Sequence, residues 1–375
     1  MRRFVRFAAD LYLLVPIGAA IAIVWANAYA SSYFQFAEMM SFAVNDVGMA
    51  FALAFLAQEV VEATLPGGTL HPWRRAILPI VAAAGGAVGA GAVYAAYIGS
   101  GDELNLLQGW PIACAVDVTF CYLIAAAIFR HRAARTFVLL LALASDAMGL
   151  LLVSYRYPAF DVHPAAAVMI VPPVWLAAVL QRAGVRQIWP YVLGCGTSSW
   201  FACYMSGAHP ALALLPVVPF LPHAARDLSR LADPARGPHK SAAHFEYVFR
   251  YPVQVIAFLF GLVNGGVLLK GFGTGTWATL AAALVGRPVG ILTAAGLAVA
   301  AGLQLPQRVG WRELVVIALV VSPSFTFGLF FATAVFPVGP LLIQTKIGAM
   351  STVAGALLAL GAARVLRVGR LANTS

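Results

Sequence analysis

One carboxylic acid stands in the middle of an apolar run that is long enough to cross a lipid bilayer. The run extends from Leu139 to Val153, and Asp146 lies at its centre. An ionised carboxylate at that depth costs at least a few kcal/mol unless it is paired, so an acid kept there indicates a functional site that carries an ion or a proton. Its partners must come from other membrane-spanning segments.

A second intramembrane acid lies beside an expected break in a helix. Asp117 follows Pro111 within one apolar segment, and an acid can neutralise the positive N-terminal end of a broken helix. In the other half of the chain, Pro323 interrupts a span in a comparable way, close to Thr326. Interruptions at corresponding places in two halves indicate an inverted-repeat transporter with its site where the breaks meet. Asp117 is then either a structural charge or an ion ligand.

Two cations lie at the same depth, Arg287 and Lys346. Arg287 stays protonated under ordinary conditions, so it must face a carboxylate or the carbonyls of a helix C-terminus. Asp146 and the break at Asp117 are its candidate partners, and the contact is either structural or part of a transport cycle. Lys346 begins the last apolar segment, where its ammonium group can also extend to the membrane surface.

Neutral and titratable groups complete the candidate site. Ser145 and Thr119 can offer neutral oxygens to a cation, although such residues more often tie helices together. His209 can titrate near neutral pH. No nucleotide-binding, zinc or hydrolytic motif is found, and the four cysteines lack the spacing of metal ligands. We therefore expect neither an ATP-driven pump nor an enzyme, and no metal or other cofactor.

The composition is that of an integral membrane protein. Of the 375 residues, 62% are hydrophobic and 10% are charged, whereas soluble domains have about 25% charged residues. A span needs about 20 mostly apolar residues, which predicts an all-α protein with twelve transmembrane helices in one domain, residues 1–375. The predicted spans are residues 11–30, 46–64, 76–98, 110–129, 136–154, 164–181, 188–205, 208–222, 247–269, 276–303, 313–335 and 340–362.

The basic residues test this topology. With twelve spans, 20 of the 24 lysines and arginines fall on the side that holds both termini, and only Arg156 and Lys270 fall on the other. The positive-inside rule therefore places both termini and the longest loop, about 223–245, in the cytoplasm. It also explains the net charge of +10 without nucleic-acid binding.

A series of short motifs follows one order along the chain. They are Asn45-Asp46, Glu59-Val60, Gly109-Trp110-Pro111-Ile112, Ala115-Val116-Asp117, Ser145-Asp146 with Gly149, Ser206-Gly207-Ala208-His209, Asn264-Gly265-Gly266-Val267, Gly286-Arg287-Pro288-Val289-Gly290-Ile291, Phe325-Thr326 and Lys346-Ile347-Gly348. The set resembles the NhaA-type bacterial sodium/proton antiporters. The resemblance implies inverted repeats, two crossing broken helices, a second bundle that commonly mediates homodimerisation, and the bacterial inner membrane. It also makes Glu59 and His209 candidate pH sensors in pH homeostasis.

Departures from the family pattern bear on the mechanism. Ser145 stands where the family has the first of two adjacent aspartates, and Arg287 stands where it has lysine. A single desolvated carboxyl at Asp146 can be neutralised by either a proton or Na+, which predicts electroneutral 1:1 exchange of Na+ or Li+ for H+ by alternating access. Related electroneutral exchangers resemble this chain at both positions.

Two alternatives use the same fold. Loss of the second aspartate could leave too few ligands to strip Na+ of its water. Arg287 could then hold an anion in a proton-coupled carrier of anions or weak acids. The chain could also be a subunit of a larger membrane complex that does not transport alone. The leading hypothesis assigns Na+ and proton binding to Asp146, with Ser145 and Thr119 as neutral ligands, and assigns charge compensation to Arg287 and Lys346. It places Asp117 among the ion- and proton-binding residues and also expects it to balance the crossed helix ends.

Overall fold

A computed structural model describes residues 2–64, 74–101, 103–156, 168–222, 241–269, 271–306, 309–337 and 339–370, without the side chains of residues 2–13, 59, 63, 74–75, 119, 154–156, 241–248 and 250. The described residues form helices and connecting turns, and no strand occurs among them, which agrees with the predicted all-α class. Most of the long cytoplasmic loop expected at 223–245 lies outside the described residues.

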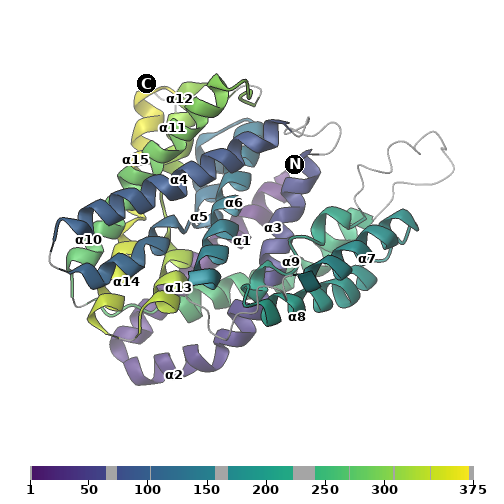
Figure 1. The fold of residues 1–375 in the computed structure, drawn as a ribbon, viewed down its shortest axis with the longest axis horizontal. Coiled ribbons are helices and arrows are strands. Elements are labelled where there is room, and N and C mark those ends of the chain that lie inside the picture. The colour runs from purple at the N-terminus through teal and green to yellow at the C-terminus, as the bar shows by residue number, and fades with distance from the viewer. Residues whose placement is uncertain are drawn as a thin grey trace.

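The helices are arranged side by side, with α7 and α8 on the opposite flank from α10, α14 and α15 (Figure 1). In chain order they are α1 (Arg2–Ala28), α2 (Ala30–Ser41), the π-helical η1 (Phe42–Gly48), α3 (Met49–Thr64), α4 (Arg74–Gly99), the 3₁₀-helical η2 (Leu104–Cys114), α5 (Val118–Ile128), α6 (Arg132–Arg156), α7 (Val171–Arg182), the π-helical η4 (Pro190–Gly196), α8 (Thr197–Ser206), the 3₁₀-helical η5 (Pro210–Leu212) and η6 (Val218–Phe220), α9 (Ser241–Asn264), α10 (Thr274–Ala281), the π-helical η8 (Ala282–Gly286), α11 (Arg287–Ala300), α12 (Trp311–Val320), α13 (Phe325–Val335), α14 (Pro340–Ser351) and α15 (Ala354–Val365).

By length and composition, five continuous helical stretches within the described residues can cross a membrane. A sixth span results if the bent pair α12 and α13 counts as one, with an angle of 51° between its halves. The five stretches are Ala30–Glu62, Ala76–Gly99, Arg132–Val153, Thr274–Ala300 and Pro340–Val365. The chain therefore folds as a multi-helix apolar protein, although fewer than twelve stretches meet this criterion.

Two predicted spans differ from the observed helices. Residues 208–222 form the short turns η5 and η6 instead of a spanning helix, because prolines at 210, 216, 219 and 222 remove backbone donors along the segment. The span predicted at 46–64 begins earlier, since α2, η1 and α3 run together from Ala30. Tyr33 anchors this extension because its hydroxyl donates to the Val263 carbonyl at 2.8 Å and accepts from the Gly266 amide at 2.8 Å.

Glycines bring α4 against η8 and α11. A Cβ atom at Gly89 would overlap the Gly286 carbonyl, and one at Gly290 would overlap the Gly85 carbonyl, so only glycine permits this backbone contact. Small residues at helix contacts are the usual means of close packing in membranes. This contact fixes the start of α11 and with it the position of Arg287.

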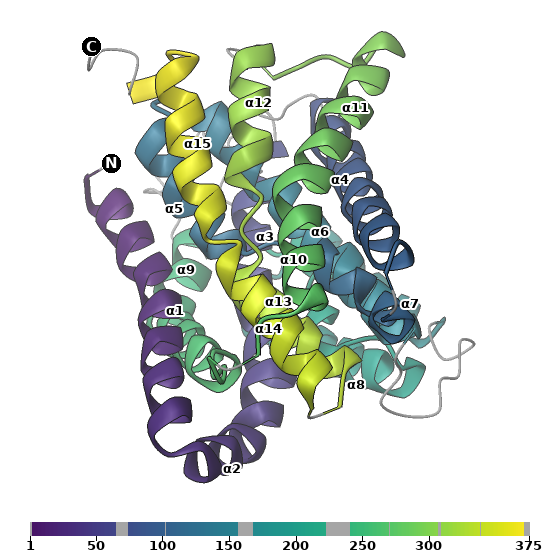
Figure 2. The ribbon, with the colours of Figure 1, turned by 90° about the vertical axis from the view of Figure 1, so that its left-hand side faces the viewer.

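Two interrupted segments meet in the middle of the molecule. An extended stretch from Ala115 to Asp117 separates η2 from α5, and residues 321–324 separate α12 from α13. The Asp117 amide donates to the Pro323 carbonyl at 2.9 Å, which joins the two interruptions directly. Pro111 lies inside η2, before the first interruption. Figure 2 shows the end of α15 and the beginning of α1 at the same end of the molecule.

Candidate functional site

Asp117 holds the beginnings of two helices. Its Oδ1 atom accepts from the Phe120 amide at 3.0 Å as the N-cap of α5. Its Oδ2 atom accepts from the Thr326 amide at 3.1 Å and from the Thr326 hydroxyl at 2.5 Å, in the first turn of α13. A carboxylate at a helix N-terminus accepts otherwise unpaired amides and interacts favourably with the helix dipole. This one buried acid therefore stabilises the start of both half-helices.

Arg287 holds the ends of the other two half-helices. Its Nη1 atom donates to the carbonyls of Val321 at 3.0 Å and Ser322 at 2.7 Å, just after α12. Its Nη2 atom donates to the carbonyls of Ala113 and Ala115, at the end of η2. The side chain is fully buried, and its charge is placed against four carbonyl dipoles. Of the two partners expected for this arginine, the structure shows the helix-end carbonyls.

Asp146 lies on α6 beside the first interruption and is fully buried. Its Oδ1 atom accepts from the Val116 amide at 2.9 Å, whereas its Oδ2 atom is buried and has no hydrogen-bond partner among the described residues. Asp146 forms no hydrogen bond or ion pair with Arg287 in the described structure, so of the two candidate partners of Arg287 the broken helix ends are the ones it contacts. The arginine instead satisfies the broken helix ends, which offer more acceptors than one carboxylate.

The proposed neutral ligands are described in part. The Ser145 hydroxyl is buried next to Asp146 and donates to the Leu141 carbonyl of its own helix at 2.9 Å, which leaves its lone pairs available as acceptors. The Thr119 side chain lies outside the described residues. The structure therefore groups Asp146, Ser145 and Asp117 around one interruption.

Lys346 lies apart from this group, on α14. Its side chain is 8% exposed, and its Nζ atom donates to the Gly266 carbonyl at 3.5 Å, just after the end of α9. The alternative in which this lysine extends to the membrane surface is wrong, because the ammonium group faces a helix end inside the protein. Its position resembles that of Arg287, since both cations face carbonyls at helix C-termini.

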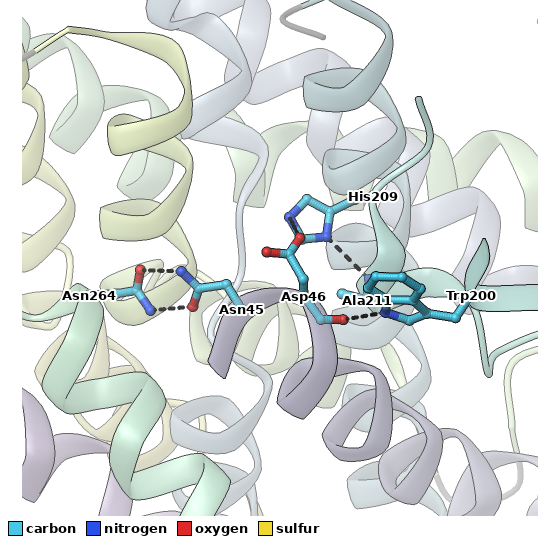
Figure 3. A network of polar contacts seen from close by, with 6 residues as sticks. All are labelled: Asn45, Asp46, Trp200, His209, Ala211 and Asn264. Carbon is cyan, nitrogen blue, oxygen red and sulfur yellow. Dashed lines mark hydrogen bonds and ion pairs between the residues drawn. The ribbon is translucent and has the colours of Figure 1, made fainter. Parts of the chain in front are cut away.

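A separate polar cluster surrounds His209 (Figure 3). The Nε2 atom of His209 lies 3.9 Å from Oδ1 of Asp46, and its Nδ1 atom accepts from the Ala211 amide at 3.2 Å. Because Nδ1 is an acceptor, the neutral ring carries its proton on Nε2, the atom that faces Asp46. The Trp200 ring donates to the Asp46 carbonyl at 3.0 Å. The cluster joins η1 to α8 and η5. The side chain of Glu59, the other candidate pH sensor, lies outside the described residues.

Two polar contacts join helices in ways that the sequence did not specify. The amides of Asn45 and Asn264 bond each other reciprocally, at 3.3 and 2.8 Å, and tie η1 to the end of α9. The Thr352 hydroxyl accepts from the Ser324 amide at 2.9 Å, which ties the kink between α14 and α15 to the break before α13. A lone hydroxyl in an apolar span is the only sequence signal of Thr352, and such signals are common.

This arrangement has a clear electrostatic division. Asp117 accepts hydrogen bonds from backbone amides at two half-helix starts, and Arg287 donates to backbone carbonyls at two half-helix ends. Both charges are therefore stabilised by backbone groups. Asp146 presents a buried carboxyl oxygen without a partner, and burying an unpaired charge is costly unless a proton or a cation neutralises it. The chemistry available at this place is therefore reversible binding of a proton or a small cation.

The known proteins that are similar to this chain are sodium/proton antiporters. The model of the family described as Na+/H+ antiporter 1 matches residues 2–365. An Na(+)/H(+) antiporter NhaA 1 of Pelobacter propionicus is 35% identical over 381 residues, which covers 99% of this chain and all of the relative. An Na(+)/H(+) antiporter NhaA of Jannaschia sp. is 36% identical over 400 residues, with 93% of this chain and 94% of the relative covered.

A solved structure shares the fold. The sodium proton antiporter MjNhaP1 from Methanocaldococcus jannaschii aligns with a TM-score of 0.62 over 95% of this chain and 92% of that protein. The sequences are 14% identical, so this likeness concerns the fold alone. The match to the family and the full-length relatives together show that the chain belongs to the Na+/H+ antiporter 1 family.

Proposed function

We propose that this protein exchanges Na+ or Li+ for H+ across the bacterial cytoplasmic membrane, by alternating access at Asp146. The observation that carries the proposal is the buried Oδ2 atom of Asp146, which has no partner among the described residues. The antiporter names of the full-length relatives support the choice of ions.

The carboxyl of Asp146 is the shared site. In one state it carries a proton on Oδ2, and the neutral acid can remain buried. When the site opens to the other side, the proton leaves and Na+ takes its place on the carboxylate, which again removes the net charge. The Val116 amide holds Oδ1 in both states, while Ser145 and Thr119 supply neutral oxygens.

Competition for one carboxyl sets the stoichiometry. Ser145 cannot release a proton as an aspartate would, and Arg287 remains charged throughout. Both terminal nitrogens of Arg287 already donate to carbonyls, so this cation stabilises the helix ends in either state. One proton then returns for each Na+, and the exchange moves no net charge.

The proposal includes a full antiporter architecture. We infer twelve membrane segments in two inverted repeats, with the interruptions at Asp117 and Pro323 forming the crossing. Both termini lie in the cytoplasm, as the distribution of arginines indicates, and a homodimer is the expected assembly. The backbone bond between the two interruptions supports the crossing. An anion carrier is less well supported, because the guanidinium group that would hold the anion is engaged with four carbonyls.

Transport by purified protein in proteoliposomes tests the proposal. An outward or inward Na+ gradient should drive a proton flux, and Asp146→Asn should abolish it. Glu103→Gln is the matched control, because it makes the same carboxyl-to-amide change on an exposed side chain. An imposed K+ diffusion potential should leave the initial rate unchanged if exchange is 1:1.

Three results would contradict parts of the proposal. Undiminished flux in Asp146→Asn would refute the site, and a rate that follows the imposed potential would refute the stoichiometry. No exchange by the isolated wild-type protein under any Na+ or Li+ gradient would refute the transport function, and would favour the role of a subunit in a larger complex.

A further inference from the structure

Two segments more than 200 residues apart bring arginines together at one end of the bundle. The turn after α15 lies over the end of α5 (Figure 2), and a Cβ atom at Gly369 would overlap the Ile128 carbonyl. This contact places the residues after α15 next to the connection between α5 and α6. The six arginines of these two segments form what we call the arginine cluster: Arg130, Arg132, Arg135, Arg364, Arg367 and Arg370.

Carboxylates do not balance this charge in the described part of the molecule. None of the six side chains forms an ion pair or a hydrogen bond with another described residue, and five of the six residues are exposed. Arg135 is partly buried, and its Nε atom is fully buried with no partner among the described residues. The described part of the protein therefore supplies no counter-charge to any of the six arginines.

The backbone at Arg367 gives an independent indication. The α15 helix ends in a Schellman turn, in which the Val368 amide donates to the Ala363 carbonyl at 2.8 Å and the Arg367 amide donates to the Arg364 carbonyl at 3.2 Å. The residue at the left-handed position of this turn is normally glycine. Here it is Arg367, with φ of 53°, the only residue other than glycine with positive φ in the described chain.

An arginine in a left-handed conformation costs energy that glycine would avoid, so backbone geometry alone does not explain Arg367. The conformation points to a use for its side chain. The general preference for basic residues on the cytoplasmic side requires only that cations be present, and does not require one at a strained position.

The location defines the ligand. The cluster lies where two apolar spans end, since Arg132 begins the span on α6 and Val365 ends the span on α14 and α15. Residues at the ends of spans lie at the depth of lipid headgroups. The N-terminus of α6 adds unpaired backbone amides and a positive dipole, which suit a phosphate group. The planar guanidinium group of an arginine can donate two parallel hydrogen bonds to the oxygens of one phosphate.

We propose that the arginine cluster is a binding site for the headgroup of an anionic phospholipid. The phosphate lies at the start of α6 between Arg132 and Arg135, and the arginines of the turn after α15 close over it. The bound lipid joins the ends of α5, α6 and α15, and α5 is the half-helix that begins at the first interruption. The site is separate from the ion site at Asp146 and does not depend on which ion is carried.

Lipid titration of the purified protein in neutral detergent tests this assignment. Phosphatidylglycerol should raise the thermal unfolding temperature of the wild type, and phosphatidylcholine should not. Arg367→Gly removes one cation and also relieves the left-handed strain, so this variant should fold at least as stably without lipid. Its apparent affinity for phosphatidylglycerol should fall about fivefold, the loss expected for one arginine near a membrane surface.

A second variant and two controls complete the test. Arg130→Gln should weaken the response to phosphatidylglycerol by a similar factor. Arg182→Gln makes the same change of charge on an exposed arginine at the end of α7 and should respond like the wild type. Equal responses in wild type, Arg367→Gly and Arg130→Gln would overturn the proposal, as would an equal loss in Arg182→Gln. Stabilisation by inorganic phosphate alone would show a site for soluble anions and would also overturn it.

Discussion

Asp117 and Asp146 are both fully buried acids beside the same interruption, yet their oxygens have different partners. Both oxygens of Asp117 accept hydrogen bonds from the first turns of α5 and α13. Asp146 has one oxygen bonded to the Val116 amide and one without a partner among the described residues. A carboxylate whose acceptors are all used stabilises a fold, whereas one with an unused acceptor can exchange its ligand. Burial alone does not distinguish the two, and their hydrogen bonds do.

The largest expected effect on stability comes from Asp117→Asn. An asparagine has one acceptor oxygen, so its NH₂ group must face either the Phe120 amide or the donors of Thr326. At one of the two helix starts, the backbone amide then loses its acceptor and faces a second donor, the asparagine NH₂ group. We expect a loss of about 3 kcal/mol in folding free energy, because a buried charge-assisted network is broken. Thermal unfolding in detergent measures it, and an unchanged midpoint would show that Asp117 does not hold the helix starts.

The roles of the charged residues at the interruptions follow partly from the sequence. An acid after a proline break belongs near a helix start and a permanent cation belongs near a helix end, because the dipole of a short helix segment acts locally. The sequence therefore indicates the kind of contact that Asp117 and Arg287 make. It does not show that each residue serves both interruptions, since that depends on how two distant segments cross.

Other features depend on tertiary contacts that no local pattern encodes. Hydropathy predicted a span at 208–222, but its prolines leave only short turns there. Lys346 has the sequence context of a residue at a membrane surface, yet its ammonium group faces the Gly266 carbonyl. Thr352 resembles any hydroxyl in an apolar helix, and only the fold brings it to Ser324.

A smaller effect is expected for Thr326→Val, which removes one of the hydrogen bonds to Asp117 and keeps the shape of the side chain. Bonds to a charged acceptor contribute about 1.5–3 kcal/mol, and the Thr326 amide still donates, so we expect a loss of about 2 kcal/mol. Thr333→Val is the matched control on the same helix, because the Thr333 hydroxyl only bonds the Leu329 carbonyl one turn earlier. Equal losses in the two variants would mean that the contact with Asp117 has no special value.

The smallest effect on stability should come from Asp146, the residue that we propose binds the transported ions. In Asp146→Asn, the side-chain oxygen can still accept from the Val116 amide, and the second position becomes a neutral NH₂ group in place of an oxygen without a partner. The variant removes a buried charge and breaks no hydrogen bond within the described residues, so its unfolding midpoint should equal or exceed that of the wild type.

The two aspartate variants should therefore give opposite results. Asp117→Asn should lower the unfolding midpoint in proportion to the lost helix contacts, while Asp146→Asn should keep the midpoint and lose transport. A large destabilisation by Asp146→Asn would show that its second oxygen has a structural partner in the folded protein. Asp146 would then resemble Asp117, and the distinction between a structural acid and an exchangeable one would no longer hold at this site.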